Sequence, residues 1–488
     1  MRSEPRAARR PHAGRRRLAL LLLTAALAAS PGCAEGEAPR AKHLLLVTVD
    51  TLRADRLGCY GGPNRPSPTI DALAAQGVRF ERAFVPRALT LPSMASFFTS
   101  RHLDEHGVLD NRMVVGEGEV LLAEHLSAAG FRARAWNASR ILAPGRSRIE
   151  QGFAPESYQH VADETRLTER AGEFLRHEFG RDGRREFLWV HYMRPHKPYK
   201  PPPPFDRRFV DPAYRGLHDG SSANLDRIYL ERETLSPQDR RHIENIYDGT
   251  IAYVDSLVKE LLAALEASGQ AGDTLVVFAA DHGEDLYSHN FYYYHANSVY
   301  RSSTQVPLVF RQPGAVRSGA ALPDLVESVD LVPTLLRWLA VPPVAGSEGW
   351  RGRDLSALLR ADAGPAPPPR ELSVAQWGDR IYAIRSLRWL YVHNPARVAP
   401  DGPPVAGRYP IAEQELYDLE ADPDEQVNVI EAHPEEAREL RAALERWQGG
   451  LARGQAAVAE SDERMAELEA LGYIDDSWRR GEKPERAP

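Results

Sequence analysis

Cysteine is nearly absent from this chain of 488 residues, which contains only Cys33 and Cys59. Two cysteines exclude a disulfide-rich scaffold and a multi-cysteine zinc or iron–sulfur site. An excess of positive charge is also missing, because 61 lysines and arginines stand against 68 aspartates and glutamates, a net charge of −7. Proteins that bind nucleic acid use a basic surface, so we expect no nucleic-acid partner.

Long apolar runs are missing after the first thirty residues. No later segment approaches the roughly 18 consecutive apolar residues that a membrane helix needs. The chain also lacks a glycine-rich phosphate loop, an HExxH zinc motif and a Gly-x-Ser-x-Gly elbow. Hydrophobic residues make up 43% and charged residues 26% of the chain, which excludes a collagen-like, coiled-coil or wholly disordered protein.

The N-terminal segment has the order of a secretory signal peptide. Residues 1–17 carry seven arginines and one glutamate, and residues 18–29 (LALLLLTAALAA) are apolar and uncharged. Twelve apolar residues span about 18 Å as a helix, too short for a bilayer core of about 30 Å. Gly32-Cys33 resembles a bacterial lipoprotein cleavage site. We therefore expect export to the periplasm or the cell envelope, with a lipid on Cys33 as the only membrane contact.

Short apolar runs rich in β-branched residues alternate with helical patterns along the chain. The apolar runs are residues 44–49, 187–192, 274–280 and 306–310. The helical patterns are residues 69–77, 119–129, 238–268 and 325–340. Such runs suit strands that are buried on both faces of a parallel sheet. The alternation therefore predicts an α/β fold with a mostly parallel central sheet and helices on both of its faces.

The pattern changes beyond a proline-rich stretch at 363–369. Residues 381–392 (IYAIRSLRWLYV) alternate like a hairpin strand with one exposed face, and residues 434–470 are helical and charged. The predicted division is a signal peptide at 1–33, a large α/β domain at 42–370, a smaller C-terminal α+β subdomain at 371–475 and a flexible tail at 476–488.

Two of the apolar runs end directly in acidic residues. LLLVTV runs into Asp50, and TLVVFAA runs into Asp281-His282-Gly283-Glu284. In open α/β sheets, ligands bind beyond the carboxyl ends of the strands. A single aspartate at a strand end is commonly a helix cap, but a buried carboxylate is costly unless it is paired or bound to a metal. Two such aspartates, one of them followed by a histidine, favour a metal site.

Thr90 begins a segment with the features of a capped helix. Threonine is a good N-cap residue, and Pro92 suits the first helical turn. One interpretation is a capped helix and nothing more. The other is that the helix N-terminus, with free N–H groups and a positive dipole end, faces an anion and holds the Thr90 hydroxyl there as a nucleophile. The spacing alone does not decide between them.

Two histidine-bearing loops follow further along the chain. Residues 191–199 (HYMRPHKPY) should bring His191, His196 and Lys197 toward the same sheet edge. A single histidine is usually structural, whereas a His-Lys pair in a proline-braced loop suits an anion or a leaving group that needs a proton. His289 and His295 lie in an aromatic loop just after the Asp281-His282 pair, so both are further candidate residues of the site.

Taken together, these segments resemble the sulfatase family of the alkaline phosphatase superfamily. The matching segments, in order, are residues 44–61 (LLLVTVDTLRADRLGCYG), 67–84, 90–108, 121–131, 191–205, 280–284, 328–336 and 415–419, with Asn111 between the third and the fourth. The likeness covers about residues 43–430. It implies an alkaline-phosphatase-like α/β/α sandwich and an enzyme that hydrolyses ester bonds.

The resemblance also implies roles for individual residues of this sequence. The implied ligands of one divalent metal are Asp50, Thr90, Asp281 and His282. The implied catalytic residues are Thr90 as nucleophile, with His196 and His295 at the ester's oxygens or the leaving oxygen. The expected substrate-binding residues are Asn111, His196, Lys197 and His295.

Three departures from the family pattern bear on the chemistry. Many members carry Cys or Ser at the Thr90 position and convert it to formylglycine, which threonine cannot form. Met94 stands where the family motif has an arginine, so one cationic group is missing. Thr51 replaces a second aspartate, and His282 replaces an asparagine. Because imidazole replaces an amide oxygen, we expect Mn²⁺ or Zn²⁺, with Ca²⁺ or Mg²⁺ as alternatives.

These departures favour an exported, metal-dependent hydrolase of phosphate or phosphonate esters. The expected reaction is in-line attack by Thr90, followed by hydrolysis of the covalent intermediate, because a threonine-linked phosphate is readily released by water. The expected substrate is a small-molecule, glycan-derived or lipid-derived anionic ester. Two alternatives stay open: a sulfuric ester hydrolase that works without formylglycine, and a catalytically impaired sulfatase-like binding protein.

Overall fold

The computed structural model describes residues 40–451 and Gly454, apart from residues 232, 291, 292, 294, 296, 297, 348, 363–366 and 396–411 and the side chains of Leu230 and Asn290. The expected signal peptide with Cys33, the expected tail at 476–488 and most of the helix expected beyond residue 450 lie outside the described residues. Among the helices that are described, none combines the length and apolarity required to span a bilayer.

The larger of two sheets has nine strands in the order β4-β3-β5-β1-β6-β8-β2-β7, with β9 also paired to β2. The strands are β1 (His43–Val49), β2 (Val78–Phe84), β3 (Phe131–Asn137), β4 (Tyr158–His160), β5 (Arg185–Tyr192), β6 (Thr274–Ala280), β7 (Gln305–Val306), β8 (Leu308–Arg311) and β9 (Ala320–Glu327). Strands β4, β3, β5, β1 and β6 are mutually parallel. The expected α/β fold with a mostly parallel sheet is therefore confirmed.

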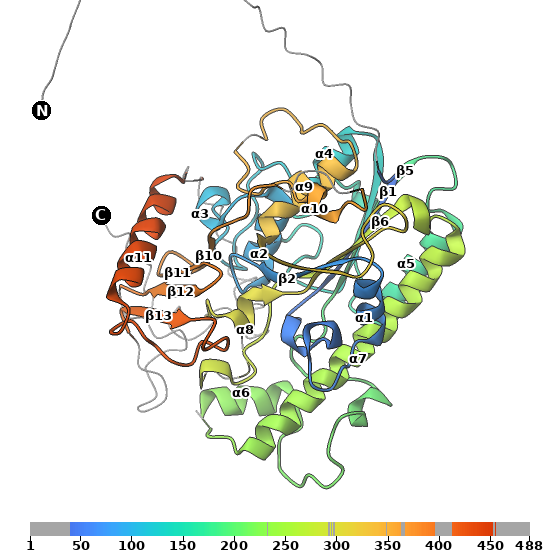
Figure 1. Cartoon of the computed structure of the whole chain (residues 1–488). Coiled ribbons are helices and arrows are strands. Elements are labelled where there is room, and N and C mark those ends of the chain that lie inside the picture. The colour runs from blue at the N-terminus through green and yellow to red at the C-terminus, as the bar shows by residue number, and fades with distance from the viewer. Residues whose placement is uncertain are drawn as a thin grey trace, which may run out of the picture. The chain divides into compact units, whose positions relative to one another are not determined.

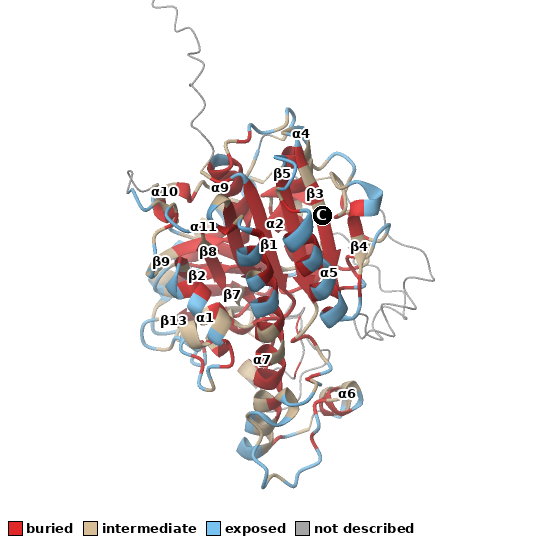
Figure 2. Cartoon of the chain, turned by 90° about the vertical axis from the view of Figure 1, so that its right-hand side faces the viewer, coloured by how far each residue is buried: buried red, intermediate tan, exposed pale blue. Residues whose placement is uncertain are grey.

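The centre of this sheet is apolar on both faces. Every residue of β1 and β6 is buried, which explains why their sequences HLLLVTV and TLVVFAA show no polar alternation. Figure 2 shows these buried strands behind helices whose outer faces are exposed. Helices α1, α5 and α7 cover one face, and α2, α4 and α9 cover the other (Figure 1).

Capping residues mark the ends of the longest helix of the described part of the chain, α7. Their bounds are α1 (Pro68–Ala75), α2 (Thr90–Thr99), α3 (Leu103–His106), α4 (Leu122–Ala128), α5 (Glu164–His177), α6 (Ser222–Leu230), α7 (Pro237–Ser268), α8 (Arg301–Thr304), α9 (Leu331–Trp338), α10 (Ser356–Leu359) and α11 (Pro434–Gly449). The long helix α7 starts with Ser236 as N-cap and Pro237 in its first turn. It ends at Gly269, whose φ of 74° is the left-handed conformation that glycine adopts without strain.

A smaller antiparallel sheet lies near the C-terminus. Its strands, in order, are β10 (Ser373–Trp377), β11 (Ile381–Arg385), β12 (Trp389–His393) and β13 (Gln414–Asp418). Leu440 and Leu444 of α11 pack against Ile384, Tyr391 and Leu416 on one face of this sheet. A smaller C-terminal part with helix and antiparallel sheet is therefore confirmed, whereas the boundary proposed at residue 370 stays a prediction.

The apolar run at 306–310 forms two strands rather than one. Pro307 has no amide hydrogen for the ladder, and it separates β7 from β8. Strand β8 pairs antiparallel with β6, so the expectation of a parallel strand here is wrong. An apolar run predicts that a strand is buried on both faces but not whether it is parallel or antiparallel to its neighbour. The direction depends on the segment that connects the two strands.

Two other segments differ from their sequence patterns. The helix expected over 325–340 begins only at Leu331, because residues up to Glu327 belong to β9, which pairs parallel with β2, and Ser328–Asp330 form a 3-10 turn. The single strand expected over 381–392 is a hairpin, whose turn is held by the Ser386 hydroxyl accepting the N–H groups of Arg388 and Trp389. In both cases pairing with a distant or neighbouring strand overrides the local spacing.

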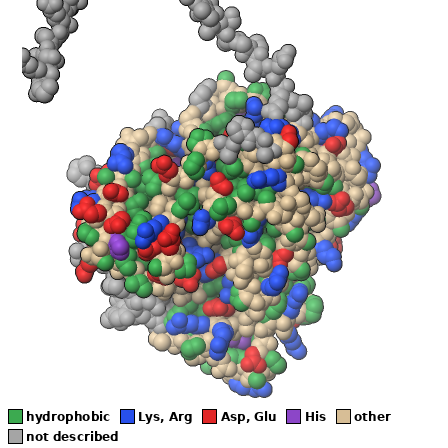
Figure 3. All heavy atoms as spheres, in the orientation of Figure 1, with side chains coloured by type: hydrophobic (Ala, Val, Ile, Leu, Met, Phe, Trp, Pro, Cys, Tyr) green, Lys and Arg blue, Asp and Glu red, His purple; other side chains and the backbone are tan. Residues whose placement is uncertain are grey.

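Acidic and basic side chains lie interspersed on the face that Figure 3 shows. Ion pairs between exposed side chains include Lys42 with Asp273 at 2.6 Å and Arg441 with Glu445 at 3.0 Å. Exposed pairs of this kind contribute little to stability because water and salt screen them, so the fold depends mainly on the apolar layers around the sheet.

Candidate active site

The register of the three central strands places the site. Val49 at the end of β1 pairs with Ala280 of β6 on one side and with Tyr192 of β5 on the other. Asp50 and Asp281, the next residues of β1 and β6, therefore emerge side by side at the carboxyl edge of the sheet. The sequence prediction that both strands deliver an aspartate to one place agrees with this geometry.

Both carboxylates are fully buried. Asp281 Oδ1 accepts the N–H groups of His282 at 2.7 Å and of Thr51 at 3.2 Å. Asp50 Oδ1 and Asp281 Oδ2 have no hydrogen-bond partner among the described residues. Burial raises the pKa of both groups well above the ordinary value, and the Asp50 charge raises the pKa of Asp281 further. Two such carboxylates require a positive charge between them to remain ionised.

Thr90 lies within reach of Asp50. Its hydroxyl donates to Asp50 Oδ2 at 3.5 Å. One turn further along α2, the Ser93 hydroxyl donates to the carbonyl oxygen of Asp281 at 2.5 Å, which fixes the helix against the end of β6. The predicted nucleophile is thus held beside both predicted carboxylate ligands.

The start of α2 differs in detail from the expectation. Leu89, not Thr90, is the N-cap residue, and Thr90 is the first helical residue. The expected row of free N–H groups is also reduced, because Leu91 donates its N–H to Asn111 Oδ1 at 2.8 Å and Pro92 has none. Asn111 therefore braces the start of α2, a contact that sequence spacing does not reveal.

His282 presents one ring nitrogen to the carboxylates. Its Nδ1 lies 2.9 Å from the carbonyl oxygen of Gly283, which can only accept, so Nδ1 carries the hydrogen. Nε2 lies 3.7 Å from Asp50 Oδ1 and 3.6 Å from Asp281 Oδ2 without a hydrogen-bond partner among the described residues. Burial lowers the pKa of His282 well below its ordinary value, so the imidazole is neutral and Nε2 offers a lone pair.

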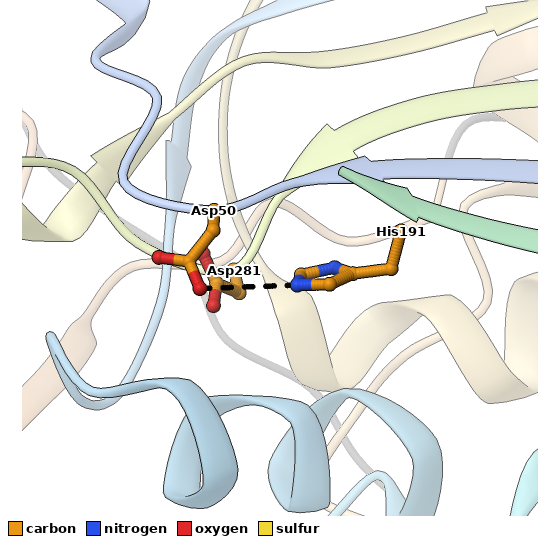
Figure 4. A group of neighbouring side chains, drawn as sticks. All are labelled: Asp50, His191 and Asp281. Atoms are coloured by element: carbon orange, nitrogen blue, oxygen red, sulfur yellow. Dashed lines mark ion pairs between the residues drawn. The ribbon is translucent and has the colours of Figure 1, made fainter. Parts of the chain in front are cut away.

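These donors fit a divalent cation. Two ligands of a tetrahedral zinc ion, each about 2.1 Å from the metal, lie roughly 3.4 Å apart, close to the separations seen here. The structure brings the four predicted ligands, Asp50, Thr90, Asp281 and His282, to one place. It adds His191, whose ligand atom lies within 4.8 Å of those of Asp50 and Asp281 (Figure 4). The sequence prediction placed His191 at this edge but did not count it as a ligand.

A second group of buried side chains adjoins this cluster. The His295 ring lies 4.6 Å from the His282 ring and 5.0 Å from the His196 ring, centroid to centroid. His295 Nδ1 lies 3.3 Å from Glu284 Oε1. Burial lowers the pKa of His196 and of His295 to about 3, and it raises the pKa of Glu284. Both predicted histidines therefore lie beside the candidate metal ligands, and a buried carboxylate backs one of them.

Lys197 points away toward a neighbouring helix. Its ammonium lies 2.9 Å from Asp226 of α6, although the lysine side chain is mostly buried. The prediction that Lys197 binds substrate is not tested by this contact, since an ion pair at the site's border can also accommodate an anion. His289, by contrast, bonds the carbonyl oxygen of Glu425 at 2.6 Å near the C-terminal sheet, which is a structural role.

Two arginines that sequence reasoning missed shape this region. Arg53 donates to the carbonyl oxygen of Glu284 at 3.0 Å and to the Ser288 hydroxyl at 2.9 Å, so it fixes the loop after β6. Arg87 is 3% exposed and lies in the turn before α2, and its charge is one cause of the low pKa of His295. Met94, at the position where the motif would have an arginine, is fully buried in the apolar core.

Comparisons with known proteins show the family of this chain. Residues 42–341 match the family model described as Sulfatase. The multifunctional alkaline phosphatase superfamily protein PehA of Trinickia caryophylli is 24% identical over 508 residues, covering 80% of this chain and 91% of its own. The N-acetylglucosamine-6-O-sulfatase of Bacteroides thetaiotaomicron is 22% identical, covering 88% of this chain and 90% of its own.

A solved structure shows the same fold. The phosphonate monoester hydrolase of Agrobacterium radiobacter superposes with a TM-score of 0.65 at 23% identity, covering 84% of this chain and 95% of that protein. At this identity the likeness concerns the fold alone. It shows that the nine-stranded sheet and its layers of helices form a known arrangement.

Proposed function

The chain belongs to the Sulfatase family and is an ester hydrolase, and from this premise we propose that it cleaves phosphate or phosphonate esters by attack of Thr90. The observation that carries the proposal is the Thr90 hydroxyl at 3.5 Å from Asp50, at the end of a buried carboxylate–imidazole cluster. Threonine cannot become formylglycine, so its hydroxyl would act as it stands. Phosphoryl and phosphonyl groups suit this nucleophile because water can release them from an alcohol oxygen.

The proposed cofactor is one divalent cation held by Asp50, Thr90, Asp281 and His282. Mn²⁺ or Zn²⁺ is favoured over Ca²⁺ or Mg²⁺ because His282 contributes an imidazole nitrogen. When bound, such an ion neutralises the carboxylates and polarises the oxygens of the ester group.

In the proposed reaction, the Thr90 oxygen attacks the central atom of the ester in line with the leaving oxygen. The Thr90 proton passes to Asp50 Oδ2, to which the hydroxyl donates, and the bond between the central atom and the leaving oxygen breaks. The leaving oxygen takes a hydrogen bond or a proton from His295 or His196, and water then hydrolyses the Thr90 ester. Glu284 Oε1, 3.3 Å from His295 Nδ1, would stabilise the imidazolium form of His295 that delivers this proton.

Sulfate esters are the second candidate substrate. A relative named as an N-acetylglucosamine-6-O-sulfatase matches along 88% of this chain. A monoanionic sulfate ester also suits a site in which Arg87 contributes one buried positive charge close to His295. Arg87 would then replace the cationic group that Met94 cannot provide.

A substrate panel separates these candidates. We would measure hydrolysis of p-nitrophenyl phenylphosphonate, bis(p-nitrophenyl) phosphate, p-nitrophenyl phosphate and p-nitrophenyl sulfate with Zn²⁺, Mn²⁺ or Ca²⁺. The proposal expects the phosphonate or phosphodiester to react fastest, with Thr90→Ala inactive on all four while still folded. Faster sulfate hydrolysis would favour the second candidate, and complete inertness without bound metal would favour an impaired binding protein.

Export belongs to the proposal as well. The order of basic, apolar and small residues before Cys33 supports secretion, with acylation of Cys33 as the anchor. Fractionation of producing cells and mass analysis of the mature N-terminus would test it. Recovery of the intact N-terminus in the cytosol would contradict it.

A further inference from the structure

His191 projects from the penultimate position of β5 toward the two carboxylates (Figure 4). Its Nε2 lies 3.8 Å from Asp50 Oδ2 and has no hydrogen-bond partner among the described residues. The side chains of His191 and Asp50 are both fully buried. At 3.8 Å the two atoms are too far apart for a hydrogen bond, yet close enough for both to reach one cation between them.

The opposite side of the His191 ring is held by a short chain of hydrogen bonds. Trp189 Nε1 donates to the Thr48 hydroxyl oxygen at 2.8 Å, since an indole N–H can only donate. His191 Nδ1 lies 2.8 Å from the same oxygen. Strand register produces this contact, because Thr48 of β1 pairs with His191 of β5. A hydroxyl oxygen has two lone pairs, so it can accept from both rings at once.

With Nδ1 as the donor, His191 presents the lone pair of Nε2 to the carboxylates. Metal-bound histidines commonly donate the other ring nitrogen to an oxygen in this way, which fixes the tautomer and the ring's orientation.

We propose that His191 is a further protein ligand of the divalent cation, oriented by Thr48 and Trp189. The inference rests on the metal site of the proposed function and adds to it a fifth ligand that the family pattern does not supply. A neutral imidazole adds a donor atom without adding negative charge. Asp50 and Asp281 then balance the cation, and the site does not repel an anionic ester.

The first test counts nitrogen ligands. Cu²⁺ bound to the apo-protein would be studied by electron spin-echo envelope modulation, which detects the remote nitrogen of each coordinated imidazole. The wild-type protein should show two coordinated imidazoles, and His191→Asn should show one. One imidazole in the wild-type protein, or an unchanged count in the variant, would overturn the proposal.

The second test measures Zn²⁺ affinity by competition with a chromophoric chelator. His191→Asn should raise the Kd for Zn²⁺ by about 100-fold or more, and Thr48→Val by about 10- to 100-fold, the range typical of outer-shell partners. His125→Asn is a matched control, because His125 is also fully buried but lies on α4, where it bonds the Val344 N–H. A His191→Asn variant within threefold of this control would refute the ligand role.

The metal site of the proposed function and the ligand role of His191 can be refuted independently of each other. Asp281→Asn should lose Zn²⁺ in either case, because it removes a ligand of the proposed function. If Asp281→Asn loses the metal and His191→Asn does not, the proposed function stands and His191 is only a packing residue. If His191→Asn does not fold, the nitrogen count of the wild-type protein still decides the question.

Discussion

Replacing Glu284 by glutamine tests the chemistry of the leaving oxygen. Glu284 is fully buried and its Oε1 lies 3.3 Å from His295 Nδ1. Glutamine keeps the volume but removes the charge that stabilises a protonated His295. The main-chain oxygen of Glu284, which accepts from Arg53, is unaffected by the change.

The magnitude follows from the hydrogen bond that is lost. A hydrogen bond to a charged group contributes about 1.5–3 kcal/mol, which corresponds to a factor of about 10 to 150 in rate if it forms only in the transition state. The whole effect is expected for an alkyl leaving group, whose oxygen needs a proton. For p-nitrophenol the effect should be small, because this leaving group departs as a stable anion.

The assay compares kcat/KM for a series of phosphonate or phosphate esters that differ only in the leaving group. Glu284→Gln should make the rate depend more steeply on the leaving group's pKa, and His295→Gln should do the same without adding to it. Glu186→Gln is the control, because Glu186 is equally buried but bonds Arg132 at the start of β5, away from the site. Equal losses for all leaving groups would refute the proposed role of the pair.

Three further predictions concern metal content and stability. Asp281→Asn should lower the metal content found by elemental analysis of the purified protein, and unchanged content would count against the ligand set. Leu46→Ala, at a fully buried position of β1, should lower the free energy of unfolding by about 2–5 kcal/mol in a urea titration, and a loss under 1 kcal/mol would contradict the packing described. Burial lowers the pKa of His106 to about 3, so the folded state holds it neutral while the unfolded chain protonates it below about pH 6.5. The contribution of neutral His106 to the free energy of unfolding is therefore complete above pH 6.5 and is lost as the pH falls toward 3, by about 2–3 kcal/mol at pH 4.5. The His106→Gln variant should show a smaller decrease in the free energy of unfolding between pH 7 and 4.5 than the wild type.

The sequence alone was sufficient to predict the two strands whose ends carry Asp50 and Asp281. Strands β1 and β6 coincide closely with the predicted apolar runs, because a strand buried on both faces needs continuous apolar residues. Asp50 and Asp281 follow directly, since parallel neighbours deliver their carboxyl ends to the same edge. His282 directly follows Asp281, and Thr90 is the first residue of helix α2.

Other contacts depend on pairings that no local pattern records. The contact between Thr48 and His191 requires the register of β1 with β5, two strands that are 143 residues apart in the chain. The bond from Leu91 to Asn111 joins a helix start to a loop 20 residues away. Residues at such separations meet only because the whole sheet and its covering helices are assembled, so single-sequence spacing cannot rank them.

Some local patterns were also ambiguous in themselves. The run LVESVD around residue 325 has apolar spacing that suits a helix or an edge strand, and its pairing with β2 decides for the strand up to Glu327. Threonine is a favoured N-cap residue, yet Leu89, one position earlier, has the extended backbone of the N-cap, and the helix begins at Thr90. These misassignments shift boundaries by a few residues and leave the site in place.

The most direct test of the central claim is mass analysis of the protein quenched during turnover of a slowly released phosphonate ester. The account predicts a phosphonyl adduct on the peptide that contains Thr90, formed at the rate of the first step and absent from Thr90→Ala. An adduct on another residue, or wild-type turnover by the Thr90→Ala variant, would contradict it.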